Sequence, residues 1–301
     1  MKISEKLSKK FSKPTLSRLI NGDLSLKSAP EAPKSTRLDI ALTNKYPEYN
    51  RSILQKFIKN SQVSVNNSII TKPNSLVTES DDISLVTPEA PQKVSLPILY
   101  EDENVIVVDK PAGILTMSKG ALNLEPTVAD FVGGAKNLAH RLDRGTSGVL
   151  IAAKNPETLG FLQKQFQNRK AHKTYYAITT GIPKLPEALI DLPLARNLKS
   201  PTTFVVDPAG KPSTTRYKVI KTNDKYALIE LKPTTGRTHQ LRVHLTYIGA
   251  PILGDPVYNP AKTPKTRLML HAAELEITLP GGLRKTFTSE VPQEFDDVFS
   301  K

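Results

Sequence analysis

Residues 137–155 read "NLAHRLDRGTSGVLIAAKN", a polar loop with one acid that runs into a short apolar segment. The acid, Asp143, stands between two arginines, and two glycines precede the apolar residues 149–153. An uninterrupted apolar run of this length, preceded by glycine, is typical of a strand buried in a sheet. The stretch therefore predicts a buried strand with a lone carboxylate in the loop before it.

Two interpretations of Asp143 follow from this stretch. In the first, Asp143 caps a turn and pairs with the neighbouring arginines in solvent, which contributes little to stability and has no functional meaning. In the second, the flanking guanidinium groups keep the carboxylate ionised and the glycines position it, so that it can act as a nucleophile or a base. The stretch alone does not choose between them, so the rest of the chain must.

The composition limits the classes of protein to consider. The chain of 301 residues is long enough for two domains, and no apolar run approaches the roughly 18 residues of a membrane span. It has no cysteine, which excludes disulfides and cysteine-based zinc sites and fits a reducing compartment. The net charge of +13 favours a polyanionic partner, nucleic acid first. We expect a cytoplasmic protein, with an organelle address left open.

Shifts in composition divide the chain into four parts. Residues 1–35, with eight Lys or Arg against three acids, predict a mobile basic arm. Residues 36–87 predict a small α/β domain, and the proline-rich residues 88–97 predict a linker. In residues 98–297, short apolar runs of β character alternate with Gly and Pro. This pattern predicts an α+β domain built on a large mixed, mainly antiparallel sheet.

Within the small domain, the sequence predicts two short helices followed by a strand, a tight turn and a second strand, "QVSVNNSIITKP". The second helix carries Arg51, Gln55, Lys56 and Lys59, which as a charge run alone would indicate only a solvated face. The order of elements, with "RLDIAL" and "ESDDISL", resembles the S-four-type RNA-binding domain. The resemblance implies that these four residues bind RNA.

One residue departs from that family's pattern. Asn67 stands in the turn where the family usually has glycine. Asparagine tolerates the left-handed backbone conformation better than most residues, so we expect the hairpin to form.

Several kinds of catalytic site can be set aside. His239 and His244 lack the glutamate of zinc-protease helices, and Arg237 and Arg242 beside them would repel a cation, so we expect no metal. The "GTSG" segment lacks the spacing of a serine nucleophile elbow. The "DKPAG" loop lacks the glycines and the G-K-[ST] of a phosphate-binding loop. Asp143 remains, with Arg237 and two tyrosines of "HKTYYA" whose usual roles would be solvation and packing.

Five segments in order resemble the RluA-type pseudouridine synthases: "DKPAGIL", "AHRLDRGTSGVLIAAKN", "RKAHKTYYAITTG", "PTTGRTHQLRVHLTYIGAPILGDPVY" and "RLMLHAAELEI". They cover residues 98 to about 295, and the H-R-L-D-x-x-T-S-G block is highly specific. The combination with an S-four-type domain resembles the enzymes that act on large-subunit ribosomal RNA. The alternatives are a transfer RNA target, or a catalytically silent RNA-binding or ribosome-assembly protein.

The resemblance makes Asp143 the catalytic aspartate. Pseudouridine formation breaks the bond between a uracil nitrogen and the sugar, turns the uracil and rejoins it through a ring carbon, which needs no cofactor. The carboxylate can attack the sugar, attack the ring or abstract a sugar proton, and the sequence does not choose among these routes.

The resemblance also implies roles for neighbouring residues. Arg237 is expected to pair with Asp143 in the site, and Tyr175 to stack on the target uracil. Leu270, or a neighbour in the same segment, is expected to form the apolar floor. Tyr176 should point to the opposite face, because side chains alternate along a strand.

The substrate and partner follow from the same resemblance. A uridine inside folded RNA must leave its stack to reach Asp143, and Arg141 is expected to fill the space it leaves. His140 and Lys110, in the same matched segments, are expected to contact the substrate. The partner is RNA, and we expect the protein to act as a monomer.

Deleting residues 1–90 should leave a folded domain with intact chemistry that binds its RNA more weakly, because the proline-rich linker separates the two parts. Soluble expression and circular dichroism test the boundary, and an RNA titration tests the affinity. An unfolded product would show that the boundary is misplaced, and an unchanged affinity would show that the N-terminal part does not grip the RNA.

Overall fold

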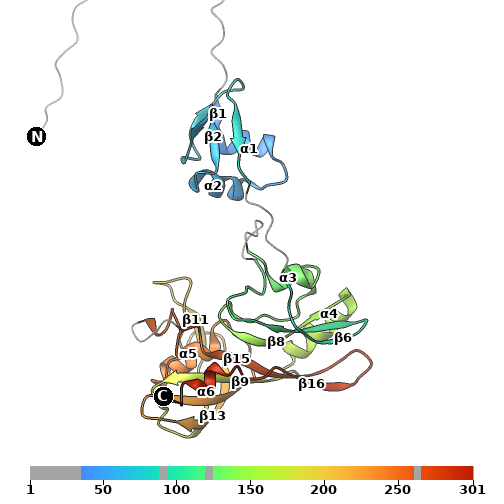
Figure 1. Ribbon diagram of the computed structural model, residues 1–301, viewed down its shortest axis with the longest axis vertical. Coiled ribbons are helices and arrows are strands. Elements are labelled where there is room, and N and C mark those ends of the chain that lie inside the picture. The colour runs from blue at the N-terminus through green and yellow to red at the C-terminus, as the bar shows by residue number, and fades with distance from the viewer. Residues whose placement is uncertain (1–34, 88–93, 119–124, 261–265, 301) are drawn as a thin grey trace, which may run out of the picture.

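The computed structural model describes residues 35–87, 94–118, 125–260 and 266–300, and Figure 1 shows their arrangement. Two of the predicted parts fall largely outside these ranges: all but the last residue of the basic arm, and residues 88–93 of the proline-rich linker. No helix in the four ranges is both long enough and apolar enough to cross a bilayer.

Residues 35–87 form a small α/β unit. Its elements are β1 (Thr36–Arg37), α1 (Leu38–Lys45), α2 (Arg51–Lys59), β2 (Val63–Val65), β3 (Ser68–Ile69), β4 (Leu76–Val77) and β5 (Ile83–Leu85). Strands β3, β2 and β5 form one antiparallel sheet, and β1 pairs with β4. The two helices and the strand–turn–strand predicted for this region are therefore confirmed.

Local sequence explains both the start of α2 and the hairpin. The side-chain oxygen of Asn50 accepts a hydrogen bond from Ile53 N at 3.1 Å and so caps the helix. The apolar face of α2 is buried in the core of the unit. In the hairpin, Asn66 and Asn67 have φ of 50° and 63°, the left-handed conformation that asparagine adopts more readily than most residues. The expectation that Asn67 can replace glycine is confirmed.

The large unit is built on a nine-stranded sheet with the order β10-β13-β14-β9-β15-β8-β7-β6, and β16 pairs with β15 off this path. The strands are β6 (Ile98–Glu101), β7 (Val105–Lys110), β8 (Ser147–Ala153), β9 (His172–Thr180), β10 (Glu187–Asp191), β13 (Thr214–Thr222), β14 (Tyr226–Pro233), β15 (Leu270–Thr278) and β16 (Arg284–Thr288). Only β8 and β15 pair in parallel among them. The predicted fold class is confirmed.

Helices and a short second sheet complete the large unit. They are α3 (Val128–Phe131), the 3-10 helix η1 (Ala135–Asn137), α4 (Pro156–Gln167), β11 (Leu194–Arg196), β12 (Phe204–Val206), α5 (Gln240–Tyr247) and α6 (Glu294–Asp297). In Figure 1, α5 and α4 lie toward opposite ends of the large sheet. At the start of α4, the side-chain oxygen of Asn155 accepts a hydrogen bond from Thr158 N at 2.8 Å and so caps the helix.

The strand predicted from the opening stretch, β8, is buried along its whole length. Because its side chains alternate, Leu150 and Ala152 pack in one core cluster. Val149, Ile151 and Ala153 pack in another, which includes Leu162 of α4. Both faces of β8 are therefore packed in the core. This packing also holds the end of the loop that leads into the strand.

Gly148 allows β8 to approach β15 closely. Its φ is +112°, and a Cβ built there would lie 2.1 Å from the carbonyl oxygen of Ala272 on β15. Only glycine fits this backbone conformation and this distance. The close parallel pairing places the loop of Asp143 beside the start of β15, at Leu270.

Gly148→Ala should destabilise the protein by about 3 kcal/mol or more, through backbone strain and the contact with Ala272. The matched control is Gly160→Ala in α4, where a Cβ meets nothing within 4 Å. That change should instead stabilise by up to about 1 kcal/mol, because alanine favours the helix. Urea unfolding of both variants tests this, and similar effects would contradict the tight β8–β15 contact.

Candidate active site

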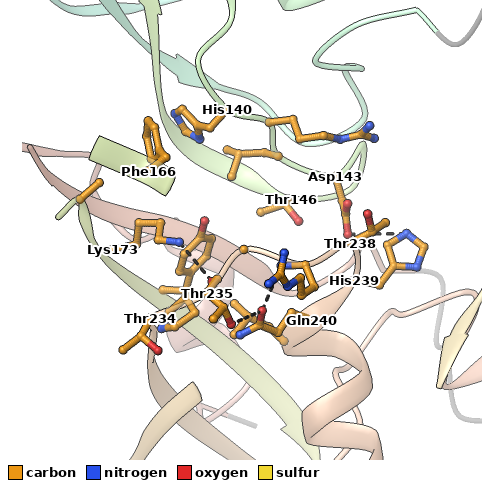
Figure 2. A pocket seen from close by; sticks show the side chains of 18 of the residues that line it. His140, Asp143, Thr146, Phe166, Lys173, Thr234, Thr235, Thr238, His239 and Gln240 are labelled. Carbon is orange, nitrogen blue, oxygen red and sulfur yellow. Dashed lines mark hydrogen bonds and ion pairs between the residues drawn. The ribbon is translucent and has the colours of Figure 1, made fainter. Parts of the chain in front are cut away.

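A cavity of about 460 Å³ opens where the loop before β8, the start of β9 and the segment 233–242 meet. Its size lies within the usual range for small-molecule sites. Figure 2 looks into it, with Asp143 and His239 on one side and His140, Phe166 and Lys173 on the other. The segments that the sequence singles out for chemistry thus converge on one site.

The loop of Asp143 is fixed by its bonds to the segment after β7. Leu142 is buried, and its backbone N–H and carbonyl bond the hydroxyl of Thr116 at 3.2 and 2.7 Å. Gly113 N donates to the carbonyl of Arg144 at 2.8 Å. These bonds on both sides of Asp143 hold its backbone in place, while the side chain stays 19% exposed toward the cavity.

Lys110 belongs to this scaffold. Its side chain is fully buried, and its ammonium donates to the carbonyls of Pro111, Ile114 and Arg144 at 2.9, 2.7 and 3.2 Å. An ammonium has three N–H donors, so all of them are used. Burial lowers the pKa of Lys110 to about 7. The predicted substrate contact through Lys110 does not fit this arrangement; the residue ties the two loops together instead.

The cationic partner of Asp143 is Arg242, on α5. Arg242 Nη1 donates to Asp143 Oδ2 at 3.1 Å. Its other nitrogens bind the fully buried Asp255 with two hydrogen bonds of 2.7 and 2.8 Å. Burial works against the charge of Arg242, but the hydrogen bonds to Asp255 raise its pKa overall. Arg242 is therefore a permanent cation. It is fixed by two hydrogen bonds to the buried Asp255 and donates a third to Asp143 at the cavity.

Arg237 does not make the ion pair that the resemblance implies. Its guanidinium Nε donates to the carbonyl of Pro212 at 3.2 Å, and the residue is exposed. It lines the cavity, but among the described residues it has no ion pair with Asp143. The expected Arg237–Asp143 pair is therefore corrected to Arg242–Asp143. The difference arises because Arg237 lies in the exposed loop before α5, whereas Arg242 lies within α5, whose residues 240–245 are all buried.

His239 lies between these two arginines and faces Asp143. Its φ is 57°, a left-handed conformation that is strained for histidine, and α5 begins at the next residue. Its Nε2 lies 3.8 Å from Asp143 Oδ2, and its Nδ1 bonds the hydroxyl of Tyr258 at 2.9 Å. Gln240 fixes the turn, because its side-chain oxygen accepts bonds from Arg237 N and the hydroxyl of Thr235.

Tyr175 and Leu270 lie where the sequence places them. Both line the cavity, Tyr175 from β9 and Leu270 from the start of β15. Burial, helped by the negative charge of Asp143, raises the pKa of the Tyr175 phenol, which stays neutral at physiological pH. Tyr176 does not line the cavity, and its hydroxyl bonds Glu230 at 3.5 Å. The predicted opposite orientation of the two tyrosines is confirmed.

His140 and Arg141 also line the cavity, in different ways. The ring of His140 stacks on Phe166 at 4.6 Å between centroids, and its Nε2 accepts a hydrogen bond from Ile151 N at 3.1 Å. Burial lowers the pKa of His140 to about 3, so the ring is neutral. Arg141 is exposed at the cavity and stays available to a substrate.

In the small unit, the four predicted RNA-binding residues divide into two pairs. Arg51 and Gln55 hold the fully buried Asp39, whose Oδ2 accepts bonds from Arg51 Nε at 3.1 Å and Gln55 Nε2 at 2.6 Å. Lys56 and Lys59 are exposed, and neither makes an ion pair with another described residue. Arg51 is exposed as well, so what distinguishes the two lysines is that neither charge is held in an ion pair within the described residues.

Sequence reasoning missed Arg242, Asp255, Lys173 and the orienting role of Tyr258. A charged residue between the apolar Leu241 and Val243, in "QLRVHL", is the one signal that could have indicated Arg242. The part of the chain that the structure describes holds no group of three or more His, Cys, Asp or Glu arranged to bind a metal. The arrangement offers one carboxylate beside a fixed cation and an aromatic ring, which suits nucleophilic or acid–base chemistry.

Comparisons with known families agree with this arrangement. The family model for RNA pseudouridylate synthase matches residues 104–247, and the S4 domain model matches residues 36–83. The first range contains the loop of Asp143, β9 and all of α5, and the second contains both helices of the small unit.

Individual relatives extend the match to nearly the whole chain. An RNA pseudouridine synthase from Aquifex aeolicus, described as uncharacterized, is 35% identical over 88% of this chain and 93% of that protein. Ribosomal large subunit pseudouridine synthase D from Borreliella burgdorferi is 34% identical over 86% and 87%. Human RNA pseudouridylate synthase domain containing 4 has a similar structure, with a TM-score of 0.55 and 27% identity over 68% of this chain and 92% of that one.

The chain therefore belongs to the family of RNA pseudouridylate synthases, which isomerise uridine to pseudouridine. The family resemblance drawn from the sequence, including the S-four-type domain, is confirmed.

Arg242→Met should lower the single-turnover rate of pseudouridine formation by about 100-fold or more, because it removes the cation that is bonded to Asp143. Arg237→Met is the matched control, and its chemical rate should fall by less than about tenfold. Circular dichroism must show that both variants are folded, since Arg242→Met leaves Asp255 buried without its partner. If the rate fell further in Arg237→Met than in Arg242→Met, the result would contradict the Arg242–Asp143 pair and support the Arg237–Asp143 pair that the resemblance implies.

Proposed function

We propose that the protein isomerises uridine in large-subunit ribosomal RNA. The observation that carries this proposal is that an S4 domain precedes the synthase domain in this chain. A relative named for the ribosomal large subunit matches 86% of this chain and 87% of its own length, a range that includes both domains. A transfer RNA target is the second candidate, because an S4-type domain grips structured RNA without specifying which one.

In the proposed mechanism Asp143 is the reacting group. Its carboxylate attacks the sugar or the uracil ring, or removes a sugar proton, and each route requires the ionised form. The hydrogen bond from Arg242 orients Oδ2 of the carboxylate, and Asp143 lines the cavity in which the uridine would lie. The loop bonds around Leu142 and Arg144 keep the carboxylate in one position before substrate arrives.

The other cavity residues position the uridine. Tyr175 offers a ring for the flipped uracil to stack on, and Leu270 an apolar surface below it. Arg141, exposed at the cavity, is suited to enter the space that the uridine leaves in the RNA. Lys56 and Lys59 of the small unit supply sequence-independent contacts to phosphates.

The proposed domain limits are a basic arm at 1–35, an RNA-binding domain at 36–87, a linker at 88–97 and the synthase domain at 98–297. The S4 match over residues 36–83 supports the second of these. A cytoplasmic location and a monomeric state complete the proposal.

Mapping pseudouridines in total RNA from cells with and without the gene tests the substrate. We expect one or a few positions of large-subunit ribosomal RNA to lose the modification, and the wild-type gene to restore it. Asp143→Asn should not restore it, because the amide cannot act as nucleophile or base although it keeps the volume. Loss confined to transfer RNA would overturn the proposed substrate, and restoration by Asp143→Asn would overturn the role of Asp143.

A further inference from the structure

Lys173 places an ammonium group in the catalytic cavity, in addition to the guanidinium groups of the arginines that line it. It lies on β9 two residues before Tyr175, so both side chains project from the same face of the strand. Both line the cavity, and Figure 2 shows Lys173 on the side opposite Asp143. A substrate placed between Tyr175 and Asp143 therefore lies within the space that Lys173 borders.

The ammonium of Lys173 is mostly unused by the protein. Among the described residues its Nζ makes one hydrogen bond, to the carbonyl of Thr235 at 3.3 Å, and no ion pair. It packs against Gly236, where an added Cβ would lie 3.7 Å from Nζ. Since an ammonium has three N–H donors, two remain for a ligand. Lys110, whose three donors all reach backbone carbonyls, shows how a purely structural lysine is satisfied in the same protein.

This arrangement costs stability in the free protein. Burial lowers the pKa of Lys173 to about 8, with no carboxylate acting against the shift. Among the described residues that line the cavity, the only acid is Asp143, which is bonded to Arg242. A cation kept in a substrate cavity at such a cost, with one hydrogen bond to a backbone carbonyl and no ion pair among the described residues, is the arrangement expected where negative charge develops on the substrate.

The reaction supplies that charge on the uracil. When the bond between C1′ and N1 breaks, its electron pair stays with the ring, and the charge spreads onto the carbonyl oxygens. If the carboxylate instead adds to the ring first, the electrons again move to a carbonyl oxygen. All three routes open to Asp143 therefore place negative charge on the same atoms.

We propose that Lys173 is a further catalytic residue, whose ammonium donates to a carbonyl oxygen of the target uracil and stabilises the charge that the ring takes up. This rests on uridine being the substrate, as proposed above. Atoms and electrons balance without a co-reactant. C1′ loses N1 and later bonds C5, the C5 proton leaves, N1 regains a proton, and Lys173 keeps all its own protons.

Lys173→Met tests the proposal, with purified full-length protein and transcripts of large-subunit ribosomal RNA, on which the wild type is assayed first. The single-turnover rate at saturating enzyme should fall by about 100-fold, as for loss of one oxyanion-hole donor. The RNA Kd should stay within about threefold, because the flipped uracil is a small part of the contact. Lys173→Arg should recover part of the rate, and the exposed Lys170→Met is the control that should match wild type.

The pH profile separates a catalytic cation from a structural one. The other ionisable groups on the cavity wall are Asp143, His140, His239, Tyr175 and four arginines. The arginines stay charged, and burial keeps His140 and Tyr175 neutral. Since the ammonium form is the active one, the wild-type rate should decline as pH rises through about 8. The part of the decline centred near pH 8 should disappear in Lys173→Gln, whereas any decline near pH 7 from Lys110, which holds the loop of Asp143, should remain in both proteins.

Each outcome decides the matter. A tenfold or larger rise in Kd with an unchanged single-turnover rate would make Lys173 a phosphate contact and overturn the proposal. So would a rate loss accompanied by a markedly lower melting temperature, because removing a half-buried cation that has no ion pair should not destabilise the fold. If the wild type modifies no ribosomal transcript, the proposed substrate fails. If wild type and Lys173→Met are equally active, only the inference on Lys173 fails.

Discussion

The guanidinium group of Arg242 connects the buried interior of the protein to the reactive carboxylate of Asp143. On its inner side it is bonded by the fully buried Asp255, and on its outer side it reaches Asp143 at the cavity. With Asp255 alone the pair would be a neutral buried ion pair, which rarely adds stability over apolar packing. The Arg242–Asp255 pair instead fixes a position, because a guanidinium held by two hydrogen bonds orients the reactive carboxylate of Asp143.

The rest of the fold brings that pair together across the sequence. Asp143 and Arg242 are 99 residues apart, one in the loop before β8 and the other on α5. The loop is set by the close parallel contact at Gly148 and by the carbonyls that surround Lys110. The helix is set by the left-handed turn at His239. Together, the contact at Gly148, the hydrogen bonds of Lys110 and the turn at His239 hold the charges of Asp143 and Arg242 3.1 Å apart.

The sequence was sufficient for the family, the fold class, the buried strand β8 and the opposite orientations of Tyr175 and Tyr176. Each of these follows from a local pattern or a specific motif. The predicted pairing of Arg237 with Asp143 is wrong because two arginines lie five positions apart in one motif. Since α5 begins at Gln240, Arg237 stays in the loop before the helix and Arg242 is buried within it. The role of Lys110 failed because its three acceptors belong to two loops that meet only in the folded chain.

The most direct test of this account is a double-mutant cycle on Arg242 and Asp255. If Asp255 acts only through Arg242, then the single-turnover rate of Arg242→Met combined with Asp255→Asn should equal that of Arg242→Met alone, within about twofold. The double variant should also be more stable than Arg242→Met, because it no longer buries an unpaired carboxylate. Independent losses that multiply in the double variant would contradict the view that one guanidinium links the two carboxylates.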